Sequence, residues 1–114
     1  MQNFKISKFH KLNINELKER ITAYISDFEF ENRDILDNFS NEWLGNMCLV
    51  KMEILKSKLG FAILIDPNFI EVSYNLPPIA LKFKNNIEDG IREKLKDIVS
   101  KIQKGKIKTK IKLA

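Results

Sequence analysis

The stretch that decides the fold is residues 76–103, LPPIALKFKNNIEDGIREKLKDIVSKIQ. Its large apolar side chains recur every three or four residues, which places them on one stripe of a helix. Pro78 suits the first helical turn, where its missing N–H costs nothing. The predicted helix is about 39 Å long at 1.5 Å per residue, so it needs a long apolar surface to cover. The stripe comprises Ile79, Phe83, Ile87, Ile91, Leu95, Ile98 or Val99, and Ile102.

Three strand candidates precede this helix and can supply that surface. The last of them alternates apolar and polar residues, the first alternates weakly, and the middle one is apolar throughout, as in a strand covered on both faces. Short turns join them, so we predict an antiparallel meander. The candidates are residues 45–55, 60–65 and 69–76, with turns at residues 56–58 and 66–68.

A further strand and a first helix are predicted at the start of the chain. Residues 4–12 mix apolar and polar side chains in an extended pattern. Asn13 is the predicted cap of a helix that ends near Asp27, and Glu16 is placed to reach back to that cap. Residues 29–41 are acidic and irregular, which predicts a loop with a short helical turn at residues 33–38. The first helix would bury Leu17, Ile21, Ile25 and Phe28, with Tyr24 on the same side.

The order strand, helix, three strands, helix predicts an α+β fold. We expect two layers over residues 1–103: an antiparallel sheet of about four strands, with both helices packed on one face. This arrangement is similar to a reduced helix-grip fold with the long helix laid across the sheet. The pattern leaves open where the first strand pairs. Residues 104–114 are expected to form a separate lysine-rich tail.

Length and composition restrict the class of protein. A chain of 114 residues is long enough for one domain with a modest core. No apolar run approaches a membrane span, and the N-terminus lacks the apolar core of a signal peptide. The single Cys48 excludes an internal disulfide and fits a reducing compartment. We therefore expect a cytoplasmic protein.

The net charge of +5 belongs to the tail. Residues 101–114 hold six lysines and no acid, so the first 100 residues carry 14 basic against 15 acidic side chains. A nucleic-acid-binding domain is therefore not indicated, and only the tail could bind RNA, anionic lipid or an acidic partner. A solubilising chain end is the open alternative. The candidate contacts to an anionic surface are Lys104, Lys106, Lys108, Lys110 and Lys112.

The residues that usually carry catalysis are sparse. One His and one Cys cannot make a Cys/His zinc site, and the four scattered glycines form no phosphate-binding loop. No serine lies in a nucleophile elbow. We expect no catalytic residue, no metal and no cofactor, and predict that the protein is not an enzyme. His10 is predicted to make a structural hydrogen bond at a strand end rather than to act as a general base.

Aromatic side chains mark the rim of a candidate binding groove. Trp43 lies where the predicted meander begins, and either forms an aromatic lip on a groove or covers the edge of the core, which is the commoner role of tryptophan. The candidate rim comprises Trp43, Tyr74 and Phe83.

The order and spacing of several short motifs resemble a known family over about residues 4–100. The chain is similar to the polyhydroxyalkanoic acid system proteins, small bacterial proteins linked with storage-polyester granules. The resemblance implies association with a granule or lipid-like surface, or with an apolar ligand, and implies no reaction. The motifs are His10-Lys11-Leu12, Asn13-x-x-Glu16, Trp43-x-Gly45, Gly60, Ile70-x-Val72 leading to Leu76, Lys84-x-x-Ile87-Glu88, and Ile91-Arg92-Glu93-Lys94-Leu95.

One sheet face is left uncovered in this prediction. Residues 60–65 are apolar on both sides, whereas helices would cover only one. An exposed apolar patch of this kind usually marks an interface. We therefore expect a homodimer in which the second sheet faces or the sheet edges meet.

Overall fold

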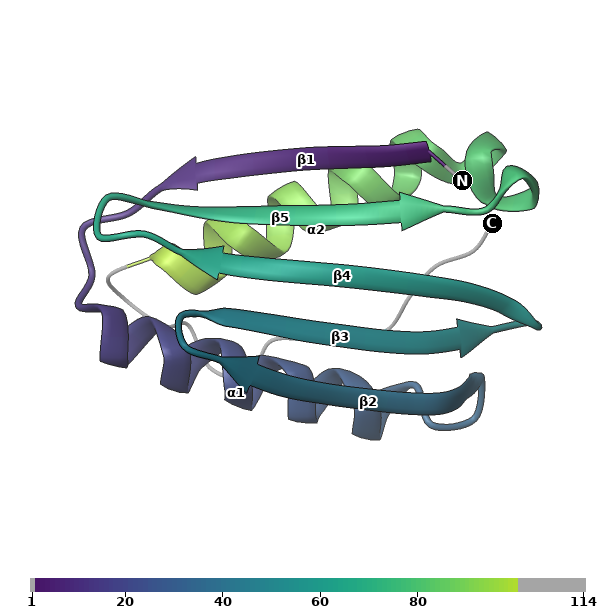
Figure 1. Cartoon of the computed structure of the whole chain (residues 1–114), viewed down its shortest axis with the longest axis horizontal. Helices are drawn as coiled ribbons and strands as arrows, with labels where there is room; N and C mark the ends of the chain where they lie inside the picture. Colours follow the sequence, from purple (N-terminus) through teal and green to yellow (C-terminus); the bar gives the residue numbers. More distant parts are fainter. Residues whose placement is uncertain (1, 101–114) are drawn as a thin grey trace.

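A computed structural model describes residues 2–100 as a five-stranded antiparallel sheet with two α-helices on one face (Figure 1). The strand order is β1-β5-β4-β3-β2. The predicted α+β class is confirmed, but the sheet has five strands rather than about four. The elements are β1 (Gln2–Phe9), α1 (Ile14–Glu31), β2 (Leu36–Leu44), β3 (Met47–Ile54), β4 (Ser57–Ile65), β5 (Phe69–Leu76), the 3₁₀-helix η1 (Pro78–Phe83) and α2 (Lys84–Val99).

The additional strand is β2, which lies in the stretch predicted to be a loop with a helical turn. It pairs with β3, but the register shifts between Asp37 and Ser40, and Asn38 has a φ of 50°. A bulge of this kind breaks the two-residue alternation that identifies a strand in a sequence. The bulge also explains why Leu36 and Phe39 both pack against the core although they are three positions apart.

The first strand takes the other edge of the sheet. β1 pairs antiparallel with β5, so that Phe4 lies opposite Tyr74 and Ile6 opposite Val72. β1 and β2 are therefore the two edge strands. β2 carries Asp37 and Glu42, and charged side chains on an edge strand oppose pairing with other chains.

The boundaries of α1 follow from two asparagines. The Oδ1 atom of Asn13 accepts hydrogen bonds from the backbone N–H of Asn15 and Glu16, as predicted for a cap. The Glu16 carboxylate pairs with Arg20. Asn32 is fully buried, and both its backbone N–H and its side-chain amide donate to the carbonyl of Phe28. The helix therefore continues to Glu31, four residues beyond the predicted end.

The predicted long helix is broken at Phe83, whose φ of −101° and ψ of 7° are not helical. Pro78–Phe83 form a 3₁₀-helix, in which residues four apart do not share a face. Ile79 is consequently 68% exposed and does not belong to the buried stripe. The stripe holds from Ile87 onward, and α2 is about 24 Å long rather than 39 Å.

Both helices lie behind the sheet in Figure 1 and form a V. α2 runs behind β5 and α1 behind β2, and the two helices approach each other where α2 ends. Leu17, Ile21 and Ile25 of α1 and Leu95 and Ile98 of α2 are buried against the sheet. The sheet contributes the rest of the buried core: Ile6, Cys48, Val50, Met52, Ile54, Ile65, Ile70, Val72, Tyr74 and Leu76.

Candidate functional site

The space between α1, α2 and the covered face of the sheet could receive a ligand, and we call it the groove. Its volume is about 630 Å³. Every described element except β1 contributes to its walls. The lining residues are Ile21, Tyr24, Ile25, Phe28, Phe39, Val50, Met52, Ile54, Leu59, Phe61, Ile63, Val72, Phe83, Asn86, Ile87, Gly90, Ile91, Glu93, Lys94, Leu95 and Ile98.

The floor of the groove is entirely apolar. It comes from the inward-facing residues of β3 and β4, which the pairing places opposite each other: Val50 opposite Phe61, and Met52 opposite Leu59. The β4 side chains are only partly buried, whereas those of β3 are buried. The middle of the sheet therefore presents apolar surface that neither helix covers.

Arg20 of α1 joins the two helices where α2 ends. Its Nη1 atom donates a hydrogen bond of 2.8 Å to the carbonyl of Ile98 and a second bond to the carbonyl of Ser100. Its Nη2 atom donates to Glu16 at 3.0 Å. The guanidinium satisfies carbonyls that the end of α2 leaves without helical partners, so it fixes α2 to α1 at the point of the V.

Away from the end of α2 the two helices diverge (Figure 1). Phe28 and Phe39 lie there on the side of α1, with ring centroids 6.4 Å apart. Phe83 and Ile87 line the side of α2. Between the helix walls, a Cβ added to Gly90 would meet nothing within 4 Å. The α2 wall is therefore open at this glycine.

The polar groups that line the groove come from the helices and not from the sheet. Among the described lining residues they belong to Tyr24, Asn86, Glu93 and Lys94. Burial raises the pKa of the Tyr24 hydroxyl, and the negative charges of Asp97, Glu31 and Glu93 raise it further. The space between the helices thus combines an apolar floor with helix walls that carry a few polar groups, among them the carboxylate of Glu93.

The three predicted rim residues take different places. Phe83 lines the groove, whereas Trp43 and Tyr74 are not among its lining residues. The Trp43 Nε1 atom donates to Thr22 Oγ1 at 3.1 Å, and Lys18 Nζ lies 5.0 Å from the ring centroid. Trp43 therefore packs β2 against the outer side of α1, which agrees with its alternative role of covering the core edge.

Tyr74 is buried and does not line the groove. Its ring lies between Phe4 and Phe61, with centroid distances of 5.5 Å and 6.0 Å. Burial, and secondarily the charge of Glu88, raises the pKa of its hydroxyl. Tyr74 thus belongs to the packing of β1 and β5 beneath α2.

His10 has a structural role, as predicted. Its Nδ1 atom accepts from the backbone N–H of Leu12 at 3.1 Å. Its Nε2 atom lies 2.7 Å from the carbonyl of Asp66 and therefore carries the proton. The ring, which is buried, ties the end of β1 to the β4–β5 turn.

Other classes of site have less support within residues 2–100. No group of three or more His, Cys, Asp or Glu side chains there could hold a metal ion. None of the helices in that range is long and apolar enough to cross a membrane. The candidate anionic-surface contacts, Lys104, Lys106, Lys108, Lys110 and Lys112, lie outside the described residues.

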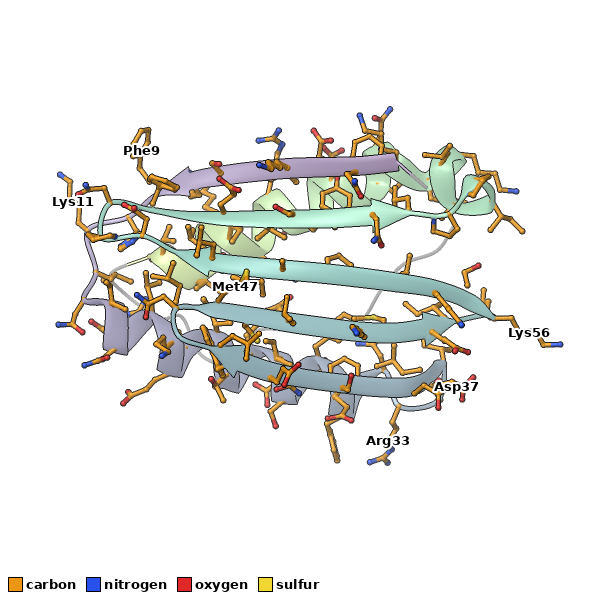
Figure 2. The ribbon with its side chains drawn as sticks, viewed as in Figure 1. Phe9, Lys11, Arg33, Asp37, Met47 and Lys56 are labelled. Atoms are coloured by element: carbon orange, nitrogen blue, oxygen red, sulfur yellow. The ribbon has the colours of Figure 1, made fainter. Side chains whose placement is uncertain are left out.

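The opposite face of the sheet is open and divides into two ends. Phe9 and Met47 lie toward one end of this face, and Lys56 and Asp37 toward the other (Figure 2). A hollow of about 430 Å³ is lined in part by the outward-facing Lys5, Lys51 and Asn75. The apolar end is exposed: Phe9 by 81%, Leu44 by 53% and Leu64 by 40%.

Searches against models of protein families, curated proteins and solved structures find no match for this chain. The resemblance to the polyhydroxyalkanoic acid system proteins and the helix-grip comparison both stay predictions.

The sequence pattern did not identify most of the groove. Ile87 and Ile91 were assigned to the buried stripe, but both are only half-buried because they face the opening. Gly90 was the one available signal, since a glycine inside an otherwise well-formed helix pattern often has a packing or functional reason.

Proposed function

We propose that the protein binds an apolar, chain-like ligand in the groove and catalyses no reaction on it. The observation that carries this proposal is the groove itself, with an apolar floor and polar groups confined to its helix walls. An amphiphile could place its chain on β3 and β4 and its head group between the helices.

The size and chemistry of the groove support a binding role. Small-molecule sites usually have volumes of about 300–1,000 Å³, apolar walls and a few polar groups that orient the ligand, and the groove of about 630 Å³ has these properties. A ligand would remove the half-exposed surface of Phe61, Ile87 and Ile91 from water. Each square ångström of apolar surface so covered contributes about 25 cal/mol before the costs of ordering.

This proposal agrees with what the family resemblance implies. A storage polyester or a lipid offers an apolar chain or surface, so association with a storage granule from the cytoplasm is a consistent setting. Fractionation of broken cells on a density gradient tests this association. Co-migration of the protein with granules supports it, and recovery of the protein only in the soluble fraction contradicts it.

The apolar end of the open sheet face supports a homodimer as a second part of the proposal. Leu44, Leu64 and Phe9 are exposed there, next to Met47 (Figure 2). Leu44, Met47 and Leu64 lie side by side on β2, β3 and β4, and exposed apolar surface of this kind favours self-association. Two copies that meet through this end would leave both grooves accessible, because the groove lies on the other side of the sheet.

Gly90 allows a specific test of the ligand site. Gly90→Leu should fill the groove without a clash, since the space beside this glycine is open. It should also strengthen α2, because Gly in a helix interior costs about 0.5–1 kcal/mol relative to Ala. Gly90→Ala is the matched control, with the same gain in helix propensity but a much smaller side chain.

The measurement is a fluorescence titration of the full chain with cis-parinaric acid, alongside thermal unfolding. We expect saturable binding by the natural protein and by Gly90→Ala, and at least about tenfold weaker binding by Gly90→Leu, equivalent to 1.4 kcal/mol. Neither variant should lower the melting temperature. Equal binding by all three proteins, or none by any of them, would contradict the groove as the ligand site.

A further inference from the structure

We infer that the chain's own segment 106–113 docks in the groove when no ligand is bound, with its isoleucines on the apolar floor and its lysines toward the helix walls. The segment lies outside the described residues, and three features of the chain and the groove point to this docking.

The first feature is the sequence of the segment, KIKTKIKL. In an extended conformation successive side chains point to opposite sides. Ile107, Thr109, Ile111 and Leu113 would then share one side, and Lys106, Lys108, Lys110 and Lys112 the other. An amphipathic strand of this kind matches a site with an apolar floor and polar groups on its helix walls.

The second feature is position and length. The segment follows α2, whose last turns contribute Leu95 and Ile98 to the groove, and Arg20 holds the carbonyls of Ile98 and Ser100 there. Five residues, including Gly105, remain for the chain to reverse direction before Lys106. Eight extended residues span about 26 Å, compared with about 22 Å along the chain between the lining residues Phe83 and Ile98.

The third feature is charge. Glu93 lines the groove, and Asp97 and Glu31 lie near enough to Tyr24 for their negative charges, with that of Glu93, to add to burial in raising its pKa. Lys94 is the one basic side chain among the described lining residues. The segment brings four lysines on one side to these helix walls. Opposite charges so placed favour docking in this orientation.

The consequence rests on the proposed function, because the docked segment and an apolar ligand would compete for the same floor. If the segment occupies the groove in about nine of ten molecules, the apparent affinity for ligand falls about tenfold. The docking itself does not depend on any ligand, so the two ideas can fail separately.

Photo-cross-linking tests the docking directly. The full chain carries p-benzoylphenylalanine in place of Ile111, and a matched control carries it in place of Lys110, one position along and on the other side of the extended segment. We expect the probe at 111 to link within the same chain to floor and wall residues such as Phe28, Phe61 and Ile87. The probe at 110 should give fewer of these links.

Two cross-linking results would overturn the inference. One is linkage from position 111 mainly to the open sheet face or to no fixed position. The other is linkage between isotopically light and heavy chains in a mixed sample, which would assign the segment to the groove of a second copy.

A titration of full-length variants with cis-parinaric acid tests the competition. Ile107→Ser with Ile111→Ser should bind about tenfold more tightly than the natural chain, whereas the conservative Ile107→Leu with Ile111→Leu should not. Unchanged affinity in the serine variant would overturn the competition. Groove cross-links without fatty-acid binding by any variant would contradict the proposed function while supporting the docking.

Discussion

At the scale of single residues, Arg20 determines how the two helices meet. Its side chain is only 14% exposed and joins Glu16 on its own helix to two carbonyls at the end of α2. Arg92 makes the same pairing with Glu88 four residues away, but its side chain is 56% exposed and has no contact of this kind to α1 among the described hydrogen bonds.

Arg20→Gln should therefore destabilise the protein much more than Arg92→Gln. Each hydrogen bond to a charged group contributes about 1.5–3 kcal/mol to the free energy of unfolding. The carbonyls that lose their partner add a desolvation cost. An exposed pair spaced by four residues contributes about 0.3–0.5 kcal/mol. Urea unfolding of both variants measures the difference, and equal losses would mean that Arg20 does not hold the V closed.

Leu55 and Lys56 are the next residues with an unusual conformation. They form the two-residue turn between β3 and β4 with φ values of 51° and 66°. Positive φ at both positions is typical of a type I′ hairpin turn, which favours Asn-Gly and disfavours side chains with a bulky Cβ. Neither residue is needed for packing, since both are exposed.

Leu55→Asn with Lys56→Gly should raise the free energy of unfolding by about 1–2 kcal/mol, because a left-handed conformation costs about that much per ordinary residue. Lys58→Gly, two residues further on in β4, is the control and should lower it by about 0.5–1 kcal/mol. Thermal unfolding of both proteins measures these changes in stability. A double variant less stable than the natural chain would contradict the turn geometry.

At the scale of the elements, α2 should contribute stability unevenly along its length. Leu95 and Ile98 are buried near the point of the V, whereas Ile87 and Ile91 are half-buried along the open groove. The cost of removing a side chain depends on whether the site can collapse or is already open to solvent.

Leu95→Ala should cost about 2–5 kcal/mol, as expected for a buried leucine that leaves a cavity. Ile87→Ala should cost less than half as much, since it leaves no closed cavity. Guanidinium chloride unfolding measures both. Equal costs would indicate that Ile87 is packed as tightly as Leu95 and that the groove is closed along its whole length.

The elements also show how far the sequence pattern could be used. Strong period-two alternation located Phe69–Leu76 to the residue, and Asn13 marked the start of α1. β2 could not be recognised, because its bulge at Asn38 breaks the alternation. The break of the last helix at Phe83 was also missed, since four-residue spacing continues through a 3₁₀ segment that does not keep it on one face.

The groove is a property of how elements are placed, which local patterns do not encode. Each helix has an apolar stripe that could equally be fully buried. Only the divergence of the helices, with Arg20 joining them at one end, leaves Phe61 and Ile87 partly exposed. Of the predicted rim, Phe83 alone lines the groove.

At the scale of the whole molecule, the apolar end of the open face predicts the oligomeric state. The chain has a mass of 13.3 kDa, so light scattering at micromolar concentration should report about twice that mass. Leu64→Lys should shift the mass toward the monomer, because β4 would then place a charge in the interface. Asn75→Lys, at the polar end of the same face, is the control. A monomeric mass for the natural protein would contradict the proposed homodimer.

The central claim is that the space between α1, α2 and the sheet receives an apolar ligand. The most direct test is methyl NMR of the full chain, isotopically labelled at isoleucine and titrated with decanoic acid. We predict saturable shifts of the Ile21, Ile25, Ile87 and Ile91 methyl signals, with nuclear Overhauser contacts from these methyls to the fatty-acid chain. Ile79, which is exposed outside the groove, should not respond. Shifts confined to residues outside the groove, or no saturable shift, would contradict the account.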